Sequence, residues 1–374
     1  MLQLSTPAAL LDLTRLRRNI ETMQSRMTVL GVKLRPHVKT SKCLEVVLRQ
    51  IAAGASGITV STLKEAEQFF AAGISDILYA VGMAAVKLPQ VRALRDQGCD
   101  LKIIVDSVEA AHAIVDFGRE YRHIFEVWLE VDTDGHRAGL KPDGDELIAV
   151  GRTLHEGGMV LGGVMTHAGA SYELNTPEAL AAMAEQERSR CVLAAERLRA
   201  AALPCPNVSV GSTPTALSAK HLEGVTEVRA GVYVFHDLVM TNIGVASMDD
   251  VALSVLTTVI GHQKEKGWAL VDAGWMAMSR DRGTQKQTHD YGYGQVCDLN
   301  CVPVDGYIVE GANQEHGIIA RVGGIDGDIA KRFPVGTQLR ILPNHACATA
   351  AQFPEYVALD SAKDVVTWPR FGGW

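Results

Sequence analysis

The sequence has little that would point to a membrane, to export or to nucleic acid. No uninterrupted apolar segment approaches the roughly 20 residues that a membrane-spanning helix needs. The start, Met1–Pro7, lacks a basic segment followed by an apolar one, so we expect no secretory signal. No basic run stands out and the formal net charge is −7, which argues against nucleic acid as a partner.

Cysteine is also scarce. The 374 residues include 7 scattered cysteines, and an odd number without regular spacing does not make a disulfide framework. We therefore expect a reducing, cytoplasmic location. Cys297 and Cys301 lie in a β-rich region, and we interpret them as structural. With 47% hydrophobic and 21% charged residues, the chain can bury a large core in one large domain with a smaller one, or in two domains.

A repeated pattern of short β-rich run, turn and helical stretch extends from Val32 to about Gly231. The candidate strands are Val32–Val38, Gly57–Val60, Asp76–Val81, Leu101–Val105, Phe125–Val131, Val160–Thr166, Asn207–Val210 and Glu227–Ala230. Amphipathic stretches between them include Thr62–Ala72, Ser107–Arg119 and Thr176–Ala202. Eight strands separated by helices predict a parallel (β/α)8 barrel in preference to an open doubly wound sheet.

After Gly231 the long helical patterns disappear, and strands are joined by turns rich in glycine and aspartate. The candidate strands here are Val251–Gly261, Trp268–Asp272, Val302–Val309, Gly317–Val322 and Gln338–Leu342, and Ala8–Leu13 could add another. We therefore predict a barrel domain over residues 14–240 and a β-rich domain made of residues 1–13 and 241–374.

Lys39 stands at the end of the first predicted strand, within the polar run Arg35–Lys42. An amine at the carboxyl end of a barrel strand is well placed to hold an aldehyde cofactor, and nearby cations would favour the neutral amine that this chemistry needs. Arg35, His37 and Lys42 are candidates for that cationic surround. An isolated lysine of this kind is more often an ordinary surface residue, so the interpretation depends on the rest of the chain.

Polar side chains follow the other predicted strands, and in a barrel they would share the rim where active sites lie. In chain order the rim residues are Lys39, Ser61, Thr62, Asp106, Arg137, His167, Gly211–Thr213, Arg229 and Gly231. Each alone is explained as a helix cap or a turn residue. Together they supply an amine, an imidazole, guanidinium groups and a small-residue loop, which is the combination that a pyridoxal phosphate site requires.

The segment Gly211–Thr215 directly follows a predicted strand and precedes a short helix. Small residues let backbone N–H groups approach a phosphate, and hydroxyls add further donors. A plain capping turn is the alternative. Gly231, at the end of the last predicted strand, could offer another amide, and two such loops on adjacent strands favour a phosphate.

His345 and Cys347 are two residues apart near the C-terminus. In a strand or an extended loop their side chains would point the same way. Imidazole plus thiolate suits Zn²⁺, and two protein ligands leave positions open for water or substrate. The alternative is a buried cysteine beside a packed histidine.

Together these motifs resemble the fold-type III pyridoxal phosphate enzymes, specifically the family of D-serine dehydratases, D-threo-3-hydroxyaspartate dehydratases and D-threonine aldolases. The sequence is most similar to the bacterial hydroxyaspartate dehydratases. The resemblance rests on Arg35–Lys42, Val131–Arg137, Gly211–Thr215 and the His-x-Cys pair, and covers nearly the whole chain. It implies an alanine-racemase-like barrel with a β domain, usually as a homodimer. It also implies pyridoxal 5'-phosphate and a divalent metal ion, with Zn²⁺ expected and Mn²⁺, Mg²⁺ or Co²⁺ as alternatives.

The resemblance also implies roles for individual residues. Lys39 matches the lysine that carries the cofactor, and His345 and Cys347 match the metal ligands. The positions that match cofactor contacts are His37, Arg137, His167, Tyr172, Gly211, Ser212, Thr213, Arg229, Gly231, Val232 and Tyr233. The aldolases typically carry His-x-Asp at the metal position, whereas the D-serine dehydratases carry His-x-Cys, as here. Arg229 departs from many family members and matches alanine racemases, in which an arginine leaves the pyridine nitrogen unprotonated.

The predicted reaction is β-elimination of water from a 3-hydroxy-D-amino acid, which gives a 2-oxo acid and ammonia. Lys39 is expected to remove the Cα proton, and the metal to act as Lewis acid on the leaving hydroxyl. An aldolase that releases glycine and an aldehyde is the first alternative. A racemase or a non-catalytic cofactor carrier would leave the His-x-Cys pair unexplained. A second substrate carboxylate would need Arg137, Arg280 or Arg282.

Overall fold

The computed structural model describes residues 4–360 and 365–374, and the chain divides into two compact units. One unit comprises Ile20–Gly231 with Gly373–Trp374, and the other Met1–Asn19 with Val232–Gly372. These boundaries lie near the predicted ones after residues 13 and 240. Among the described residues, no helix is long and apolar enough to span a bilayer.

The first unit is built on eight parallel strands in the order β2-β9-β8-β7-β6-β5-β4-β3. Their bounds are β2 Lys33–Leu34, β3 Ile58–Val60, β4 Asp76–Gly82, β5 Asp100–Val105, β6 Glu126–Glu130, β7 Val160–Met165, β8 Asn207–Val210 and β9 Glu227–Val228. The first and last strands of this order meet through a parallel bridge between His37 and Thr59. The backbone N–H of Val38 donates to the Thr59 carbonyl at 2.9 Å. The sheet therefore closes on itself, and the predicted barrel is confirmed.

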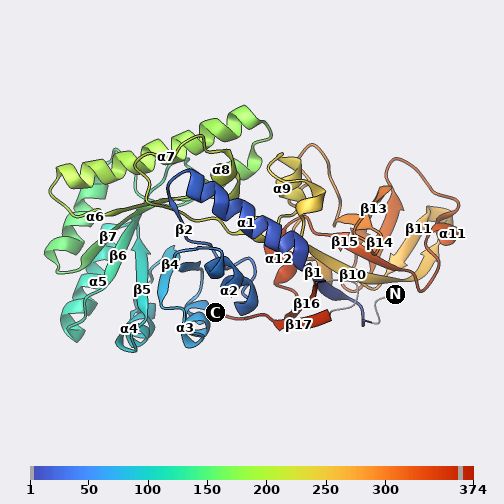
Figure 1. Ribbon diagram of the computed structural model, residues 1–374, viewed down its shortest axis with the longest axis horizontal. Coiled ribbons are helices and arrows are strands. Elements are labelled where there is room, and N and C mark those ends of the chain that lie inside the picture. The colour runs from blue at the N-terminus through green and yellow to red at the C-terminus, as the bar shows by residue number, and fades with distance from the viewer. Residues whose placement is uncertain (1–3, 361–364) are drawn as a thin grey trace. The chain divides into compact units, whose positions relative to one another are not determined.

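Helices lie outside the strands of this unit (Figure 1). They are α2 Leu44–Ala52, α3 Leu63–Ala71, α4 Leu88–Asp96, α5 Val108–Tyr121, α6 Asp145–Glu156, α7 Pro177–Ala200 and α8 Thr213–Ser218, while α1, Leu13–Val29, spans the unit boundary. Side chains of Thr62, Ser107 and Thr176 cap α3, α5 and α7 by accepting a backbone N–H from the first turn. These caps explain why the helices begin where the sequence predicts.

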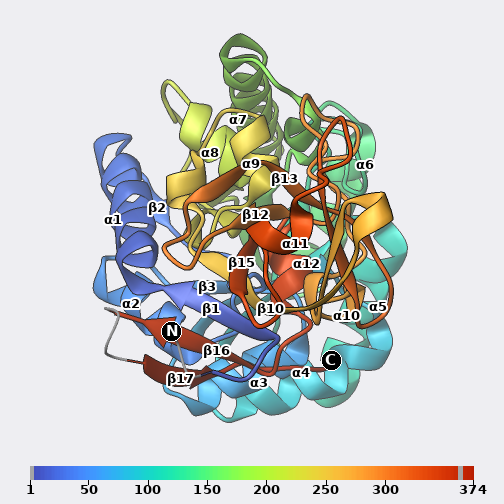
Figure 2. The ribbon, with the colours of Figure 1, turned by 90° about the vertical axis from the view of Figure 1, so that its right-hand side faces the viewer.

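The second unit contains a nine-stranded sheet in the order β11-β14-β13-β12-β15-β10-β1-β16-β17. Figure 2 shows its strands β1, β16 and β17 side by side. Its strands are β1 Ala8–Asp12, β10 Leu253–Gln263, β11 Trp268–Val271, β12 Gln295–Cys297, β13 Pro303–Ala312, β14 Gly317–Arg321, β15 Gln338–Leu342, β16 Glu355–Leu359 and β17 Val365–Pro369. Its short helices are α9 Leu238–Asn242, α10 Trp275–Met278, α11 Ile329–Arg332 and α12 Ala346–Ala350. Because β10 also pairs with β11, six of the strands close into an antiparallel barrel. The sequence had not predicted β12, β16 or β17.

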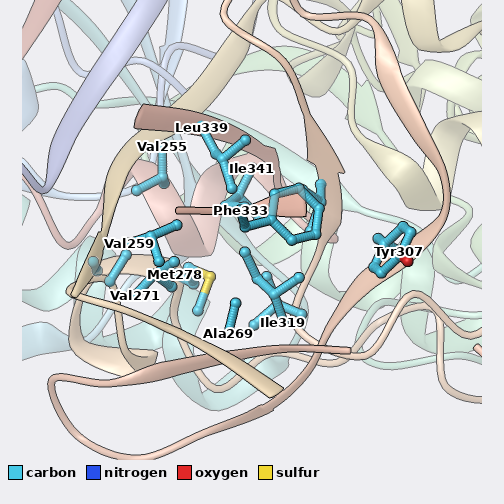
Figure 3. Packing of buried hydrophobic residues seen from close by; sticks show 14 of the residues in the cluster. Val255, Val259, Ala269, Val271, Met278, Tyr307, Ile319, Phe333, Leu339 and Ile341 are labelled. Atoms are coloured by element: carbon cyan, nitrogen blue, oxygen red, sulfur yellow. The ribbon is translucent and has the colours of Figure 1, made fainter. Parts of the chain in front are cut away.

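The core of the second unit lies inside this antiparallel barrel (Figure 3). Leu339 and Ile341 are two residues apart on β15, so their side chains share one face of the strand. Both point inward, toward Val255 and Val259 of β10. Burying each of these aliphatic side chains fully is worth roughly 1.5–3 kcal/mol. This packing fixes β15, the strand that leads directly into the segment containing His345.

Candidate active site

Lys39 is exposed, two residues beyond the bridge that closes the barrel. The regular part of β2 ends at Leu34, but the backbone continues extended. The N–H of Arg35 donates to the Val228 carbonyl at 2.9 Å, and that of His37 to the Ala230 carbonyl at 2.8 Å. These bonds carry Lys39 to the carboxyl end of the barrel strands, as the sequence predicts.

Two of the cations expected around Lys39 are paired elsewhere, so that expectation is wrong for Arg35 and Lys42. Arg35 binds Glu227 at 2.9 Å and Asp76 at 2.8 Å. Lys42 binds the buried Glu65 at 2.9 Å. The carboxylates come from distant parts of the chain, so the local run Arg35–Lys42 could not indicate that these positive charges are neutralised.

Two histidines, His37 and His167, lie beside Lys39 and are held in the neutral form, so the expectation of a cationic surround is wrong for His37 as well. Burial, reinforced by the charge of Lys39, lowers the pKa of His167 to about 3 and places that of His37 well below its ordinary value. His167 Nδ1 lies 3.0 Å from the Gly211 carbonyl oxygen. A neutral ring in this geometry carries its proton on Nδ1, which leaves Nε2 as a hydrogen-bond acceptor. His37 Nε2 lies 3.4 Å from Ser61 Oγ.

Arg229 is buried, with 4% of its surface exposed. Its guanidinium donates to the hydroxyl of Ser209 and to the carbonyl of Thr166, so it reaches across the ends of β7 and β8. Burial lowers the pKa of Arg229, while the nearby Glu227 opposes that shift. Arg229 is thus a fixed cation, and it acts electrostatically on both His37 and His167.

The loop after β8 is shaped by glycine and by its own hydrogen bonds. Gly211 has a φ of +131°, and a Cβ there would lie 2.4 Å from the Arg229 carbonyl oxygen, so no larger residue fits. Ser212 caps α8 reciprocally with Thr215. The N–H of Gly211 donates to Glu187 Oε1 at 3.2 Å and that of Ser212 to Thr215 Oγ1 at 3.0 Å. A phosphate at this loop would therefore compete with protein acceptors for these two amides.

Gly231 packs closely against the lysine segment. A Cβ at this position would lie 3.0 Å from the His37 carbonyl oxygen and 3.2 Å from Thr40 Oγ1. Val232 and Tyr233, the next two predicted cofactor contacts, are buried and belong to the other unit. Glycine at 231 thus permits the close approach of two loops at the rim.

The remaining rim residues have identifiable partners. Arg137 is exposed and its Nη2 lies 3.5 Å from Glu130 Oε1. The ring of Tyr172 lies 6.1 Å from that of His167. Asp106 accepts the N–H of Gly139 at 3.2 Å. Like Thr62, the cap of α3, Asp106 thus has a structural role.

Glu187 is a buried carboxylate on α7 that was not predicted as a site residue. Its Oε1 accepts the N–H of Ala168 at 2.8 Å and that of Gly211 at 3.2 Å. Glu187 thereby ties the loop that carries His167 to the loop after β8. The sequence did contain a signal, because Glu187 lies on the buried face of the helix with Ala184 and Cys191.

His345 and Cys347 lie together in the second unit, although not for the reason predicted. The expected strand or extended loop is wrong, because α12 begins at Ala346 and only His345 keeps an extended backbone. The two side chains nevertheless hydrogen-bond to each other. His345 Nδ1 also lies 2.6 Å from Asp281 Oδ2. Asp237 Oδ2 accepts the N–H of Ala346, between the two predicted ligands, at 2.8 Å.

The electrostatics of this pair suit a cation. Burial lowers the pKa of His345, but the charges of Cys347 and Asp281 outweigh burial and raise it to about 11. Over residues 4–360 and 365–374, no group of three or more His, Cys, Asp or Glu side chains is placed to hold a metal ion. A divalent ion bound by His345 and Cys347 would therefore complete its coordination with water or substrate.

Two arginines considered for a second substrate carboxylate lie in the same unit. Arg282 is paired with Asp290 at 2.7 Å. Arg280 stacks on the ring of Trp275, with 5.1 Å between the guanidinium carbon and the ring centroid. Their geometry does not single out either of them.

Known proteins resemble the chain along its whole length. It matches the family described as "Alanine racemase, N-terminal domain" over residues 11–238 and the one described as "Putative serine dehydratase domain" over residues 252–359. It is 68% identical to D-threo-3-hydroxyaspartate dehydratase of Delftia sp. (strain HT23), with 100% of this chain and 99% of the relative covered. D-serine dehydratase of Dictyostelium discoideum is 30% identical, with 97% and 95% covered. Two solved structures of D-threo-3-hydroxyaspartate dehydratase, one of a variant in a metal-free form, match with a TM-score of 0.99 and 68% identity, covering 100% of this chain and 99% of theirs.

Proposed function

We propose that this chain, which belongs to the alanine racemase-like family that includes the D-threo-3-hydroxyaspartate and D-serine dehydratases, removes water from 3-hydroxy-D-amino acids and yields a 2-oxo acid and ammonia. The first proposed substrate is D-threo-3-hydroxyaspartate, which would give oxaloacetate, and the second is D-serine, which would give pyruvate. One observation carries the proposal. Lys39 is exposed at the rim of a closed barrel, beside two neutral histidines.

The residues at the rim fit pyridoxal phosphate. The cofactor supplies an aldehyde that condenses with amines and a ring that withdraws electrons from Cα. Lys39 is the exposed amine that would hold the aldehyde carbon. A Cβ at Gly211 would lie 2.4 Å from the Arg229 carbonyl oxygen, and one at Gly231 would lie 3.0 Å from the His37 carbonyl oxygen. Glycine at these two positions therefore lets the loops after β8 and β9 come together at the rim that carries Lys39, where we propose that the phosphate binds. Thr213 and Gly231 are the proposed backbone donors, together with Val232.

Lys39 is also the proposed base. Once released from the cofactor, its amine would be available to remove the Cα proton of the substrate. The protonated lysine then needs a hydrogen-bond acceptor rather than another cation. His167 meets this need, because burial keeps it neutral and its Nε2 is an acceptor.

Arg229 sets the charge near the ring nitrogen in this proposal. Its position is fixed by Ser209 and Thr166, so it cannot swing away when a ligand binds. A guanidinium is too basic to give its proton to a pyridine nitrogen. A ring nitrogen beside Arg229 would remain unprotonated and withdraw electrons less strongly, which increases the need for help at the leaving hydroxyl.

His345 and Cys347 are the proposed ligands of a divalent ion, which supplies Lewis acidity to the leaving hydroxyl. Imidazole and thiolate favour Zn²⁺ over the harder Mn²⁺, Mg²⁺ or Co²⁺, so we propose Zn²⁺. Asp281 would hold the proton on His345 Nδ1 and leave Nε2 for the ion, as carboxylates beside metal-binding histidines commonly do.

A product assay distinguishes this function from the aldolase. The protein would be incubated with D-threo-3-hydroxyaspartate, D-serine and D-threonine, with the L-enantiomers as controls. We expect oxo acid and ammonia in equal amounts from the first two D-amino acids. Glycine and an aldehyde as the main products would establish the aldolase instead.

The quaternary structure and location belong to the proposal as well. We propose a homodimer, which light scattering of the holoenzyme would test. We also propose a cytoplasmic location, because all seven cysteines are free.

A further inference from the structure

A second pair of cysteines, Cys297 and Cys301, has no part in the sites described above. Cys297 ends β12, and Cys301 lies in the turn that leads to β13. Only 0% and 3% of their surfaces are exposed, and they pack in one apolar cluster with Leu238, Val251 and Leu342. Their thiols hydrogen-bond to each other. The two sulfur atoms are therefore neighbours in a fixed arrangement.

The backbone at Cys301 is unusual for a cysteine. Its φ is +66°, in the left-handed region that favours glycine. Two backbone hydrogen bonds close the turn. The N–H of Cys301 donates to the Asp298 carbonyl at 3.0 Å, and the N–H of Asp298 donates to the Val302 carbonyl at 2.9 Å. Glycine would meet the demands of this turn with less strain, so the turn itself does not explain the thiol.

Two arginines surround the thiol pair. Arg15 Nη1 lies 3.5 Å from Cys301 Sγ, and Arg15 is itself balanced by Asp12 and Asp249, each 3.6 Å away. Arg340, on β15, lies directly across the strand pair from Cys297 on β12. Its Nη1 lies 3.5 Å from the carbonyl oxygen of Leu299, in the turn that also contains Cys301. The guanidinium of Arg340 is thus held at the turn that carries Cys301.

Arg340 lacks an obvious counter-charge. It is 4% exposed, and its Nη2 is buried without a hydrogen-bond partner. Its side-chain bonds go to Ser254 Oγ at 2.9 Å and to the Leu299 carbonyl, and no carboxylate of the described residues pairs with it. Because a buried guanidinium is costly without a compensating anion, a thiolate in the adjacent pair is the natural counter-ion.

The ionisation of the pair agrees with this geometry. The hydrogen bond from Cys297, opposed by burial and assisted by the charges of Arg340 and Arg15, lowers the pKa of Cys301 below the ordinary value of a thiol. Burial instead raises the pKa of Cys99 to about 11. Cys99 is also 3% exposed, so it provides a control with matched burial.

We propose that Cys297 and Cys301 form an oxidation site in which the Cys301 thiolate, balanced by Arg340, reacts with a hydroperoxide and then closes a disulfide with Cys297. In the first step the Cys301 sulfur attacks the peroxide, an S–O bond forms, the O–O bond breaks and an alcohol or water leaves. In the second step the Cys297 sulfur attacks Cys301, the S–S bond forms and the oxygen leaves as water. The two sulfur atoms lose two electrons in all, and the peroxide gains them.

The test treats the folded holoenzyme with hydrogen peroxide and follows each cysteine by peptide mapping under non-reducing conditions. We expect a Cys297–Cys301 crosslink and the loss of two hydrogen atoms from the intact mass. Cys301 should be oxidised at least ~10-fold faster than Cys99, because the thiolate is the reacting form. Cys297→Ser should stop at a sulfenic acid on Cys301, which dimedone traps, and Cys99→Ser should behave as the unmodified protein.

A second variant protects the test against misfolding. Cys301→Gly suits the positive φ, so it should fold and should abolish the crosslink. Absorbance of thiolate in the far ultraviolet at neutral pH should also fall in Cys301→Gly and stay unchanged in Cys99→Ser. Equal oxidation rates for Cys301 and Cys99 in the folded protein, or no crosslink between Cys297 and Cys301, would overturn the proposal.

Discussion

Replacing Glu187 tests how the rim of the barrel is held together. Glu187 Oε1 accepts two backbone N–H groups, from Ala168 at 2.8 Å and from Gly211 at 3.2 Å, in a buried position. Glu187→Ala would leave both donors buried without a partner, and each such loss costs about 1–3 kcal/mol. We therefore expect the free energy of unfolding to fall by about 3 kcal/mol.

The matched control is Glu187→Gln, which keeps an acceptor oxygen of the same reach. We expect this variant to stay within about 1 kcal/mol of the unmodified protein near pH 5 in urea unfolding. Equal stability of the Ala and Gln variants would refute the reasoning.

The pH dependence provides an independent check. Burial raises the pKa of Glu187, although hydrogen bonds from Thr215, Ala168 and Gly211 oppose the shift. The folded state then holds the proton more tightly than the unfolded state, so this contribution to stability is complete below about pH 4 and is lost as pH rises through the folded pKa. Glu187→Gln removes the titrating group. The free energy of unfolding of Glu187→Gln, relative to that of the unmodified protein, should therefore increase with pH. If the difference between the two proteins is the same at pH 4 and pH 8, the raised pKa assigned to Glu187 is wrong.

Three further predictions concern the proposed cofactor and metal. Lys39→Ala should give no pyridoxyl adduct after borohydride reduction and tryptic mapping, and an adduct at another lysine would remove Lys39 from its role. Gly231→Ala should weaken pyridoxal phosphate binding more than folding, because a Cβ 3.0 Å from the His37 carbonyl oxygen would push the proposed donor amide aside by a few tenths of an ångström. Cofactor titration and thermal unfolding measure the two effects, and a larger loss of stability than of affinity would argue against it. Cys347→Asp should shift metal preference from Zn²⁺ toward Mn²⁺ or Mg²⁺ in competition binding, and an unchanged preference would exclude Cys347 as a ligand.

Local patterns in the sequence predicted the barrel well. Asn207–Val210 was predicted with the bounds that β8 has, and the stretch Thr176–Ala202 contains α7 with its cap. These features depend on neighbours in sequence, because alternation defines a strand and a cap defines a helix start. The count of eight strands predicted a closed sheet, but the bridge between His37 and Thr59 that closes it was not predicted.

The errors concern partners that are distant in sequence. Arg35 binds Glu227, which is 192 residues away, and no local pattern indicates that pairing. The helix after His345 begins at Ala346, whose N–H donates to Asp237, more than a hundred residues earlier, and no local pattern indicates this contact. His345 and Cys347 still meet, so their spacing was informative even though the backbone expected for them was wrong.

The most direct test of the account compares product formation with cofactor retention after chelation. The holoenzyme would be treated with a chelator, and oxo acid from D-threo-3-hydroxyaspartate would be measured beside the borohydride-reducible cofactor. We predict that chelation abolishes oxo acid, that the cofactor remains reducible onto Lys39, and that Zn²⁺ restores the reaction. His345→Ala should reproduce the chelated state without recovery. Full dehydratase activity in the chelated enzyme would contradict the metal-assisted elimination proposed for His345 and Cys347.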